Sequence, residues 1–157
     1  TETLKLTSSQ FKNNNIEIVN SIDDIKLFGS QNELQQTLIN LLKNAKEELL
    51  KKESSQKRYI FVDTYQDDFS AVIKIKDNAG GIPSEILPNI FDAYFTTKEK
   101  EGGTGIGLYM SKQIVEGSMK GKIDVINSNY TFEDEQYYGA ELIMKIPLDL
   151  RVEGKKQ

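Results

Sequence analysis

The sequence predicts a two-layer α/β fold, in which a β-sheet carries helices on one face. Two observations favour this fold. Apolar and polar residues alternate in "IEIVNS", "KRYIFVDTYQ" and "SAVIKIKD", as they do in half-buried strands. In residues 31–52 and 105–116 the apolar positions recur every three or four residues, as they do in amphipathic helices. A sheet covered by these helices would bury the apolar sides of both kinds of element.

The expected elements follow one another along the whole chain. After a short strand candidate near Leu4, they are a strand at 16–21, a helix at about 31–52, a hairpin at 58–77, a loop with one helical turn in "NAGGIPSEILPN", a helix at about 105–116, and strands in "GKIDVINSN" and "GAELIMKIPLDL". We expect residues 1–157 to form a single domain, with linker or frayed ends at 1–14 and 151–157.

The composition narrows the classes of function. The chain has 157 residues and a net charge of -4, with no long basic tract, so nucleic acid is not an expected partner. No apolar run approaches membrane-spanning length, so we expect a cytoplasmic domain without direct membrane contact. The chain has no cysteine and no histidine, so its own chemistry must rest on carboxylates, amides, hydroxyls, lysines or backbone groups.

The first long helix carries two asparagines beside its apolar stripe. The predicted stripe consists of Leu34, Leu38, Leu41, Leu42, Ala45 and Leu49. Asn40 and Asn44 are four residues apart and therefore lie one above the other at its edge. They are either polar padding or a pair of amide oxygens that face a hard cation such as Mg²⁺.

The strand at 70–77 ends in a carboxylate on its core face. Ala71, Ile73 and Ile75 share this face, and Asp77 continues it. A buried carboxylate needs hydrogen-bond donors, which an exocyclic purine amine could supply. The alternative is an aspartate that caps the following turn. Gly80 and Gly81 would let the backbone approach a flat ligand.

Four glycines crowd into "EGGTGIGL", directly before the helix at 105–116. A helix N-terminus with a bare glycine backbone attracts phosphate, while the alternative is a flexible loop with a glycine cap. The Walker and dinucleotide-binding fingerprints do not match the spacing. Because the residues before the glycines are polar and charged, we expect 96–104 to form a mobile lid.

In their order, these motifs resemble the catalytic ATP-binding domain of bacterial sensor histidine kinases, within the Bergerat ATPase superfamily. "LQQTLINLLKNA" is similar to the N box of that family, and "DNAGGIP" to its first glycine box. "IFDAYFTTK" resembles the F box, "GGTGIGL" the second glycine box and "GAELIMKIPL" the closing strand. The resemblance covers residues 15–150 and implies a mixed sheet with about three helices on one face. The ATP site would lie between these helices and the lid.

The resemblance also implies roles for individual residues. Asn44 and Asn40 would face Mg²⁺ and the phosphates, and with Lys98 they are the expected catalytic residues. Asp77 would accept a hydrogen bond from the adenine amine, and Phe91 and Phe95 would anchor the lid. The implied ATP-binding residues are Asn40, Asn44, Asp77, Gly81, Ile82, Thr97, Lys98, Gly103, Thr104, Gly105, Ile106, Gly107 and Leu108.

Three positions depart from the pattern of the family. Ala79 stands where the first glycine box usually has glycine, which reduces backbone freedom there. Ala140 stands where many members have threonine, so one water-mediated contact to the base is in doubt. Glu47 replaces a basic residue, which puts more weight on Lys98 and Lys100 for phosphate contacts.

The implied activity is transfer of the γ-phosphoryl group of ATP to a histidine on a separate dimerisation domain, with a response regulator downstream. The parent kinase could be membrane-anchored. The alternatives are an anti-sigma-factor serine kinase, a Bergerat-type ATPase and a nucleotide-sensing module. Such ATPases place a glutamate base four residues before the metal-binding asparagine. Here that position holds Asn40, so we expect slow hydrolysis.

Overall fold

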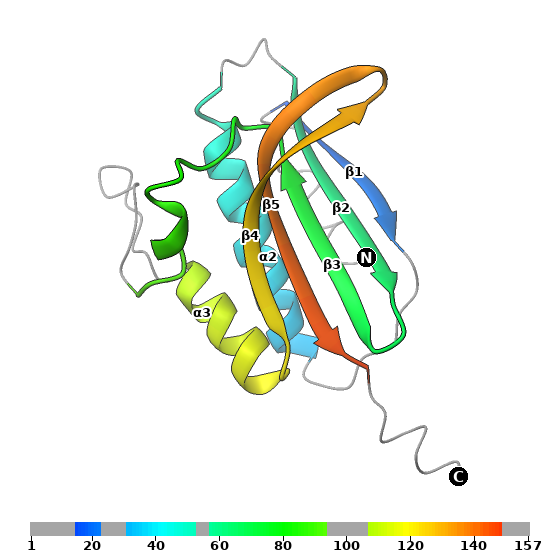
Figure 1. Ribbon diagram of the computed structural model, residues 1–157, viewed down its shortest axis with the longest axis vertical. Coiled ribbons are helices and arrows are strands. Elements are labelled where there is room, and N and C mark those ends of the chain that lie inside the picture. The colour runs from blue at the N-terminus through cyan, green and yellow to red at the C-terminus, as the bar shows by residue number, and fades with distance from the viewer. Residues whose placement is uncertain (1–14, 23–30, 53–56, 94–106, 149–157) are drawn as a thin grey trace.

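The computed structural model describes residues 15–22, 31–52, 57–93 and 107–148. These residues form two layers, with one β-sheet and two α-helices packed against a single face of it (Figure 1). The predicted two-layer arrangement is therefore confirmed. The strand candidate near Leu4 lies outside the described residues.

The sheet has five strands in the order β1-β2-β3-β5-β4. β1 runs parallel to β2, and the other neighbouring pairs are antiparallel, so the sheet is mixed as predicted. The strands are β1 (Ile16–Ile22), β2 (Arg58–Gln66), β3 (Ser70–Asp77), β4 (Lys122–Phe132) and β5 (Glu135–Pro147).

Two α-helices cover this sheet. α2 (Gln31–Leu49) is the predicted long helix, and α3 (Gly107–Gln113) continues into a π-turn, η3 (Ile114–Ser118). A 3-10 turn, η1 (Leu87–Asn89), lies in the loop after β3. Where about three helices were predicted, the described part of the chain thus has two α-helices and these two short helical elements. The long helix ends three residues before the predicted boundary.

The core lies between the helices and the sheet. The predicted stripe of α2 is confirmed, because Leu41, Leu42, Ala45 and Leu49 are buried, while Leu34 and Leu38 pack partly buried against the cluster. The strands contribute Ile60, Val62, Ile73, Ile75, Leu142, Met144 and Ile146. Each fully buried aliphatic side chain stabilises the fold by about 1.5–3 kcal/mol.

The β4–β5 hairpin is longer than predicted. The strands continue to Phe132 and restart at Glu135, where the sequence indicated a connection between 129 and 139. Glu133 and Asp134 form the turn, with φ of 49° and 63°. Positive φ at both central residues characterises the tight turns that suit the strand twist. Figure 1 shows the hairpin curling across the sheet at the top of the view.

An aromatic cluster joins the hairpin to β2 on the helix-free face of the sheet. Tyr59 and Phe61 alternate with the core residues of β2 and therefore point away from the helices. In the ring contacts of Tyr59 and Phe61 with Tyr130, Phe132 and Tyr137, the ring centroids are 5.0–5.4 Å apart. The hairpin is thus fixed over β2, which also fixes its position relative to the end of β3. In the described ranges, no helix is long and apolar enough to cross a membrane.

Candidate functional site

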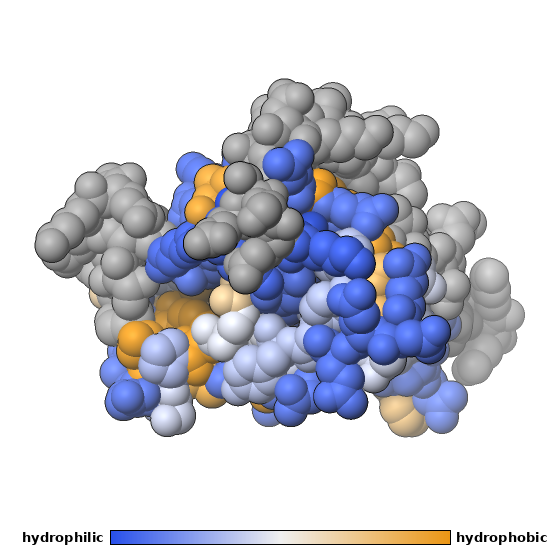
Figure 2. Space-filling model, turned by 90° about the horizontal axis from the view of Figure 1, so that it is seen from above, coloured by the Kyte–Doolittle hydropathy of each residue, from blue (hydrophilic) through white to orange (hydrophobic). Residues whose placement is uncertain are grey.

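A hollow of about 440 Å³, counting the solvent at its mouth, lies between α2, the loop after β3 and α3. Seen from above, apolar side chains gather in a recessed patch that borders polar side chains (Figure 2). The lining residues are Asn44, Ala45, Glu48, Ile75, Asp77, Ala79, Gly81, Ile82, Ile90, Leu108, Val125, Ala140 and Leu142. Most of them are apolar, and the few polar groups converge from α2 and the end of β3. This is the composition expected of a small-molecule site.

Asp77 is the buried carboxylate of this hollow, with only 6% of its surface exposed. Its Oδ1 accepts hydrogen bonds from the backbone N–H of Ala79, at 3.0 Å, and of Ala140, at 3.3 Å. The burial predicted from the strand period is confirmed. The alternative, in which Asp77 caps the following turn, is also correct, because the hydrogen bond from the Ala79 N–H closes that turn. Asp77 is therefore both a buried carboxylate and a turn cap.

Burial raises the pKa of Asp77 to about 6. The two backbone N–H groups act in the opposite direction, because they stabilise the ionised form. Two charged side chains add smaller effects: Glu48 of α2 raises this pKa, and Lys52, just after the helix, lowers it. Asp77 is therefore poised to bind or release a proton near neutral pH.

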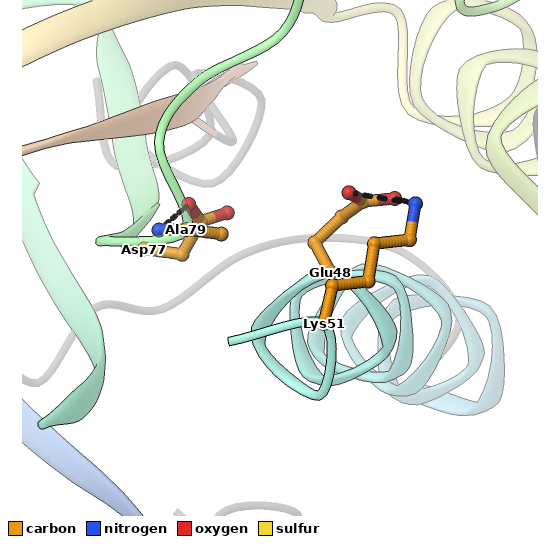
Figure 3. Close-up of polar contacts among 4 residues, drawn as sticks. All are labelled: Glu48, Lys51, Asp77 and Ala79. Carbon is orange, nitrogen blue, oxygen red and sulfur yellow. Dashed lines mark hydrogen bonds and ion pairs between the residues drawn. The ribbon is translucent and has the colours of Figure 1, made fainter. Parts of the chain in front are cut away.

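Glu48 lines the hollow from α2, on the side opposite Asp77 (Figure 3). Its carboxylate forms an ion pair with Lys51, with a distance of 3.3 Å between Nζ and Oε2. Glu48 follows Asn44 by four residues, so both residues lie on one face of the helix. α2 thus contributes an amide and a carboxylate to the same wall.

The two asparagines of α2 have different surroundings. Asn44 lines the hollow, whereas Asn40 lies outside the lining. The Oδ1 of Asn40 accepts a hydrogen bond from Nε2 of Gln36, at 3.1 Å. In the described part of the chain, no cluster of three or more histidine, cysteine, aspartate or glutamate residues could hold a metal ion.

The loop after β3 requires glycine at two positions. Gly80 has a φ of 100° and Gly81 a φ of 85°, a region that other residues rarely adopt. Ala79 needs no positive φ, so its departure from the family pattern leaves this loop intact. The Gly80 N–H donates to the carbonyl of Tyr138, at 3.1 Å, which ties the loop to β5.

The second glycine box lies only partly within the described residues. Gly107 begins α3, and Leu108 lines the hollow. Phe91 is partly buried against the core, and the Nζ of Lys112 lies 5.4 Å from its ring centroid. The other predicted residues, and the lid at 96–104, lie outside the described ranges: Phe95, Thr97, Lys98, Gly103, Thr104, Gly105 and Ile106.

Glu48 follows Asn44 by one helical turn, and this spacing agrees with its position in the lining of the hollow. Sequence reasoning missed a contact behind the hollow. Asn127 on β4 forms two hydrogen bonds with the backbone of Ile82. No motif indicated this pair, because Asn127 and Ile82 are 45 residues apart.

Comparison with known proteins identifies the family. The sequence model of the histidine kinase-, DNA gyrase B- and HSP90-like ATPases matches residues 29–150. The sensor protein KdpD of Clostridium acetobutylicum is 35% identical over 130 residues, which are 80% of this chain and 14% of that protein. Sporulation kinase A of Bacillus subtilis is 37% identical over 94 residues, or 60% of this chain and 14% of that protein. The chain thus spans about one seventh of the length of these relatives.

Solved structures agree with this result. The catalytic domain of the histidine kinase ThkA has a TM-score of 0.75 and 26% identity, covering 93% of this chain and 89% of that one. The mycobacterial sensor histidine kinase MprB has a TM-score of 0.73 at 21% identity, covering 93% and 92%, and shares the fold. The predicted Bergerat fold is therefore confirmed. The chain belongs to the family of histidine kinase-, DNA gyrase B- and HSP90-like ATPases, and its likeness is to the ATP-binding catalytic domains of sensor histidine kinases.

Proposed function

We propose that this chain holds ATP for a two-component sensor histidine kinase and presents the γ-phosphoryl group to a histidine on a separate dimerisation domain. One observation supports this most: a single apolar hollow is lined by Asp77, by the glycine loop at Gly81 and Ile82, by Asn44 and by Leu108. These residues come from three separate motifs that resemble one kinase domain. Their position around one hollow supports the proposal that they bind a single ligand.

The end of the hollow at β3 suits a purine base. The backbone N–H groups of Ala79 and Ala140 both donate to Oδ1 of Asp77, so we place the exocyclic amine of adenine against Oδ2. Apolar residues such as Ile75, Ile82 and Leu142 line the space that the ring would occupy. Burying an aromatic ring there gives affinity, and the single carboxylate orients the base.

The end of the hollow at Asn44 suits the phosphates. The amide oxygen of Asn44 is a hard ligand of the kind that Mg²⁺ accepts alongside waters and phosphate oxygens. Mg²⁺ bound there would neutralise the phosphate charge that develops during transfer. Because the hollow lacks a cage of carboxylates, a metal would enter with the nucleotide rather than alone. We assign Asn40, Gly107 and the second glycine box, with Thr97 and Lys98, to the same end.

In the proposed transfer, the bond between the γ-phosphorus and the bridging oxygen breaks as a bond to the imidazole nitrogen of the acceptor forms. The chain contains no histidine, so the acceptor must come from another domain. Positioning and charge stabilisation supply most of the catalysis in such a reaction. The phosphohistidine would then serve a response regulator, and the parent kinase could be anchored to a membrane.

The alternatives receive less support. The relatives described above are named as a sensor protein and a sporulation kinase, not as anti-sigma-factor kinases or motor ATPases. Asn40 occupies the position at which the related ATPases carry a glutamate base, and an amide cannot take a proton from water. A module that senses nucleotide without transfer would share the same hollow, so an assay of transfer has to separate these functions.

The test mixes this chain with the histidine-bearing dimerisation domain of its parent kinase, Mg²⁺ and ATP labelled at the γ-phosphate. We expect acid-labile, base-stable label on the partner and none on this chain. Asn44→Ala should abolish the labelling, whereas Asn32→Ala, an exposed asparagine on the same helix, should not change it. Label on serine or threonine, or rapid ATP hydrolysis by the chain alone, would contradict the proposal.

A further inference from the structure

We propose that Asn127 is a positioning residue for the base end of the hollow, through which the β4–β5 hairpin sets nucleotide affinity. The inference rests on the function proposed above, because it concerns the same hollow. Asn127 lies on β4 and is absent from the lining of the hollow. Its effect on a bound nucleotide would therefore be exerted through Ile82, which does line the hollow.

The side-chain amide of Asn127 forms hydrogen bonds with both main-chain polar groups of Ile82. Its Oδ1 accepts a hydrogen bond from the Ile82 N–H, and its Nδ2 donates one to the Ile82 carbonyl, each at 2.8 Å. This pairing imitates the contact between neighbouring strands, although the loop is not part of the sheet. It satisfies both main-chain groups of Ile82, which the loop itself leaves to be paired elsewhere.

The loop needs such a restraint because of its glycines. Gly80 and Gly81 both adopt positive φ, and glycine loses more conformational freedom on ordering than any other residue. The β4–β5 hairpin forms hydrogen bonds that restrain this loop. The Gly80 N–H donates to the carbonyl of Tyr138, at 3.1 Å, and the Tyr130 hydroxyl donates to the carbonyl of Asp77, at 2.7 Å. The segment from Asp77 to Ile82 is thus held at successive points by one hairpin.

The packing around Gly81 leaves the loop little room to shift toward the hairpin. A Cβ atom at Gly81 would lie 2.6 Å from Cε2 of Tyr138 and 2.9 Å from Oδ1 of Asn127. The backbone therefore already sits directly against these two side chains. Removing the Asn127 amide would release Ile82 and open space behind it, so the wall that faces the base would lose its fixed position.

The test measures nucleotide affinity by calorimetry in Asn127→Ala. We expect ADP and ATP to bind about tenfold more weakly, because two hydrogen bonds that fix the loop are lost. The loss should be equal for the two nucleotides, since they share the base. In the transfer assay, KM for ATP should rise while kcat stays unchanged, because the base is held equally in the ground and transition states.

Two further variants make the test specific. Asn127→Asp keeps the acceptor for the Ile82 N–H but turns a carboxylate oxygen toward the Ile82 carbonyl, so we expect nucleotide binding to weaken in this variant too. Asn129→Ala removes an exposed asparagine two residues along the same strand and should bind nucleotide like the wild type. Should Asn127→Ala fail to fold, Asn127→Asp and Tyr130→Phe take its place, since each removes one contact between hairpin and loop.

Hydrogen exchange of the Ile82 amide in the free protein tests the restraint without any ligand. This amide should exchange faster in Asn127→Ala than in the wild type or in Asn129→Ala. Unchanged exchange, or unchanged ADP affinity, would overturn the inference. A wild-type chain that binds no nucleotide would instead refute the proposed function, and the exchange measurement would still decide whether Asn127 holds the loop.

Discussion

Asp77 illustrates, at the scale of a single residue, how a binding group opposes stability. The carboxylate is 6% exposed and accepts two backbone hydrogen bonds, yet burial still raises its pKa to about 6. Ionised Asp77 therefore destabilises the free protein. In the proposed function, the adenine amine would supply a further donor to this carboxylate. The residue is expected to be retained for binding rather than for folding.

The first prediction concerns the stability of Asp77→Asn without nucleotide. Because the pKa is raised on folding, the folded protein binds more protons than the unfolded chain between pH 3.8 and about 6. Wild-type stability thus falls as pH rises through this window. Asn keeps an acceptor for Ala79 and Ala140 and carries no charge. At pH 7.5 Asp77→Asn should be more stable, by up to about 3 kcal/mol.

Urea unfolding at pH 7.5 and at pH 3.5 checks this prediction. The difference between the two proteins should be large at the higher pH and largely absent at the lower one, where Asp77 is protonated in both states. A wild type that is more stable than Asp77→Asn at pH 7.5 would show that the ionised carboxylate has a compensating partner.

The second prediction concerns the affinity of the wild type for ATP as a function of pH. Only the ionised carboxylate can accept hydrogen bonds at both oxygens, from the backbone at Oδ1 and from the proposed adenine amine at Oδ2, so protonation should weaken binding. Affinity should fall as pH decreases below about 6. Calorimetry at pH 5 and pH 7.5 measures the difference. In Asp77→Asn the same change of pH should have a much smaller effect.

At the scale of elements, the β4–β5 hairpin is the part that holds the site together. Gly139 on β5 packs so tightly against the end of β3 that a Cβ atom there would lie 1.8 Å from the Asp77 carbonyl oxygen. Ala140, the next residue, donates its N–H to the Asp77 carboxylate. The close approach of these two strands thus fixes the carboxylate that faces the hollow.

The third prediction follows from this approach. Gly139→Ala places a methyl group against backbone atoms that cannot rotate away, so the strands must separate. Overpacking of this kind typically destabilises a protein by about 1–3 kcal/mol, and we expect the upper end of that range here. Gly117→Ala is the matched control, because a Cβ atom at Gly117 meets nothing within 4 Å. Urea unfolding should show the control to be at least as stable as the wild type, because alanine fits there without strain and restricts the unfolded chain.

The elements differ in how far their sequence predicts them. α2 was predictable because its buried leucines recur with the helical period, and β3 because Ala71, Ile73 and Ile75 alternate. The hairpin turn was not, since Glu133 is unusual at a position that requires positive φ. The Asn127–Ile82 contact was equally hidden, because it depends on the strand order of the folded sheet.

At the scale of the whole molecule, folding and nucleotide binding are coupled through the hollow. Its walls come from α2, β3, β5 and α3, so any ligand in it contacts both layers of the fold. A ligand that binds only the folded state adds its binding free energy to the stability of the protein. The order of the motifs along the sequence could predict that these elements line one site. The distances between the walls of the hollow depend on tertiary packing, which the motifs do not specify.

The last prediction therefore compares the wild type and Asp77→Asn with and without MgADP at pH 7.5. A hydrogen bond to a charged group contributes roughly 1.5–3 kcal/mol, so the variant should bind about 10- to 150-fold more weakly. At a ligand concentration of about 100 times the wild-type Kd, the wild type gains about 2.7 kcal/mol of stability. By the same relation, the variant gains only about 0.3–1.4 kcal/mol.

Nucleotide should thus reduce the stability advantage that Asp77→Asn has in the free protein by about 1.3–2.4 kcal/mol. Thermal unfolding with increasing MgADP measures this change, and Asn129→Ala should respond like the wild type because its side chain is exposed. Equal stabilisation of the wild type and Asp77→Asn would place the base elsewhere. Unequal stabilisation would mean that the carboxylate which weakens the free fold is the same group that holds the nucleotide.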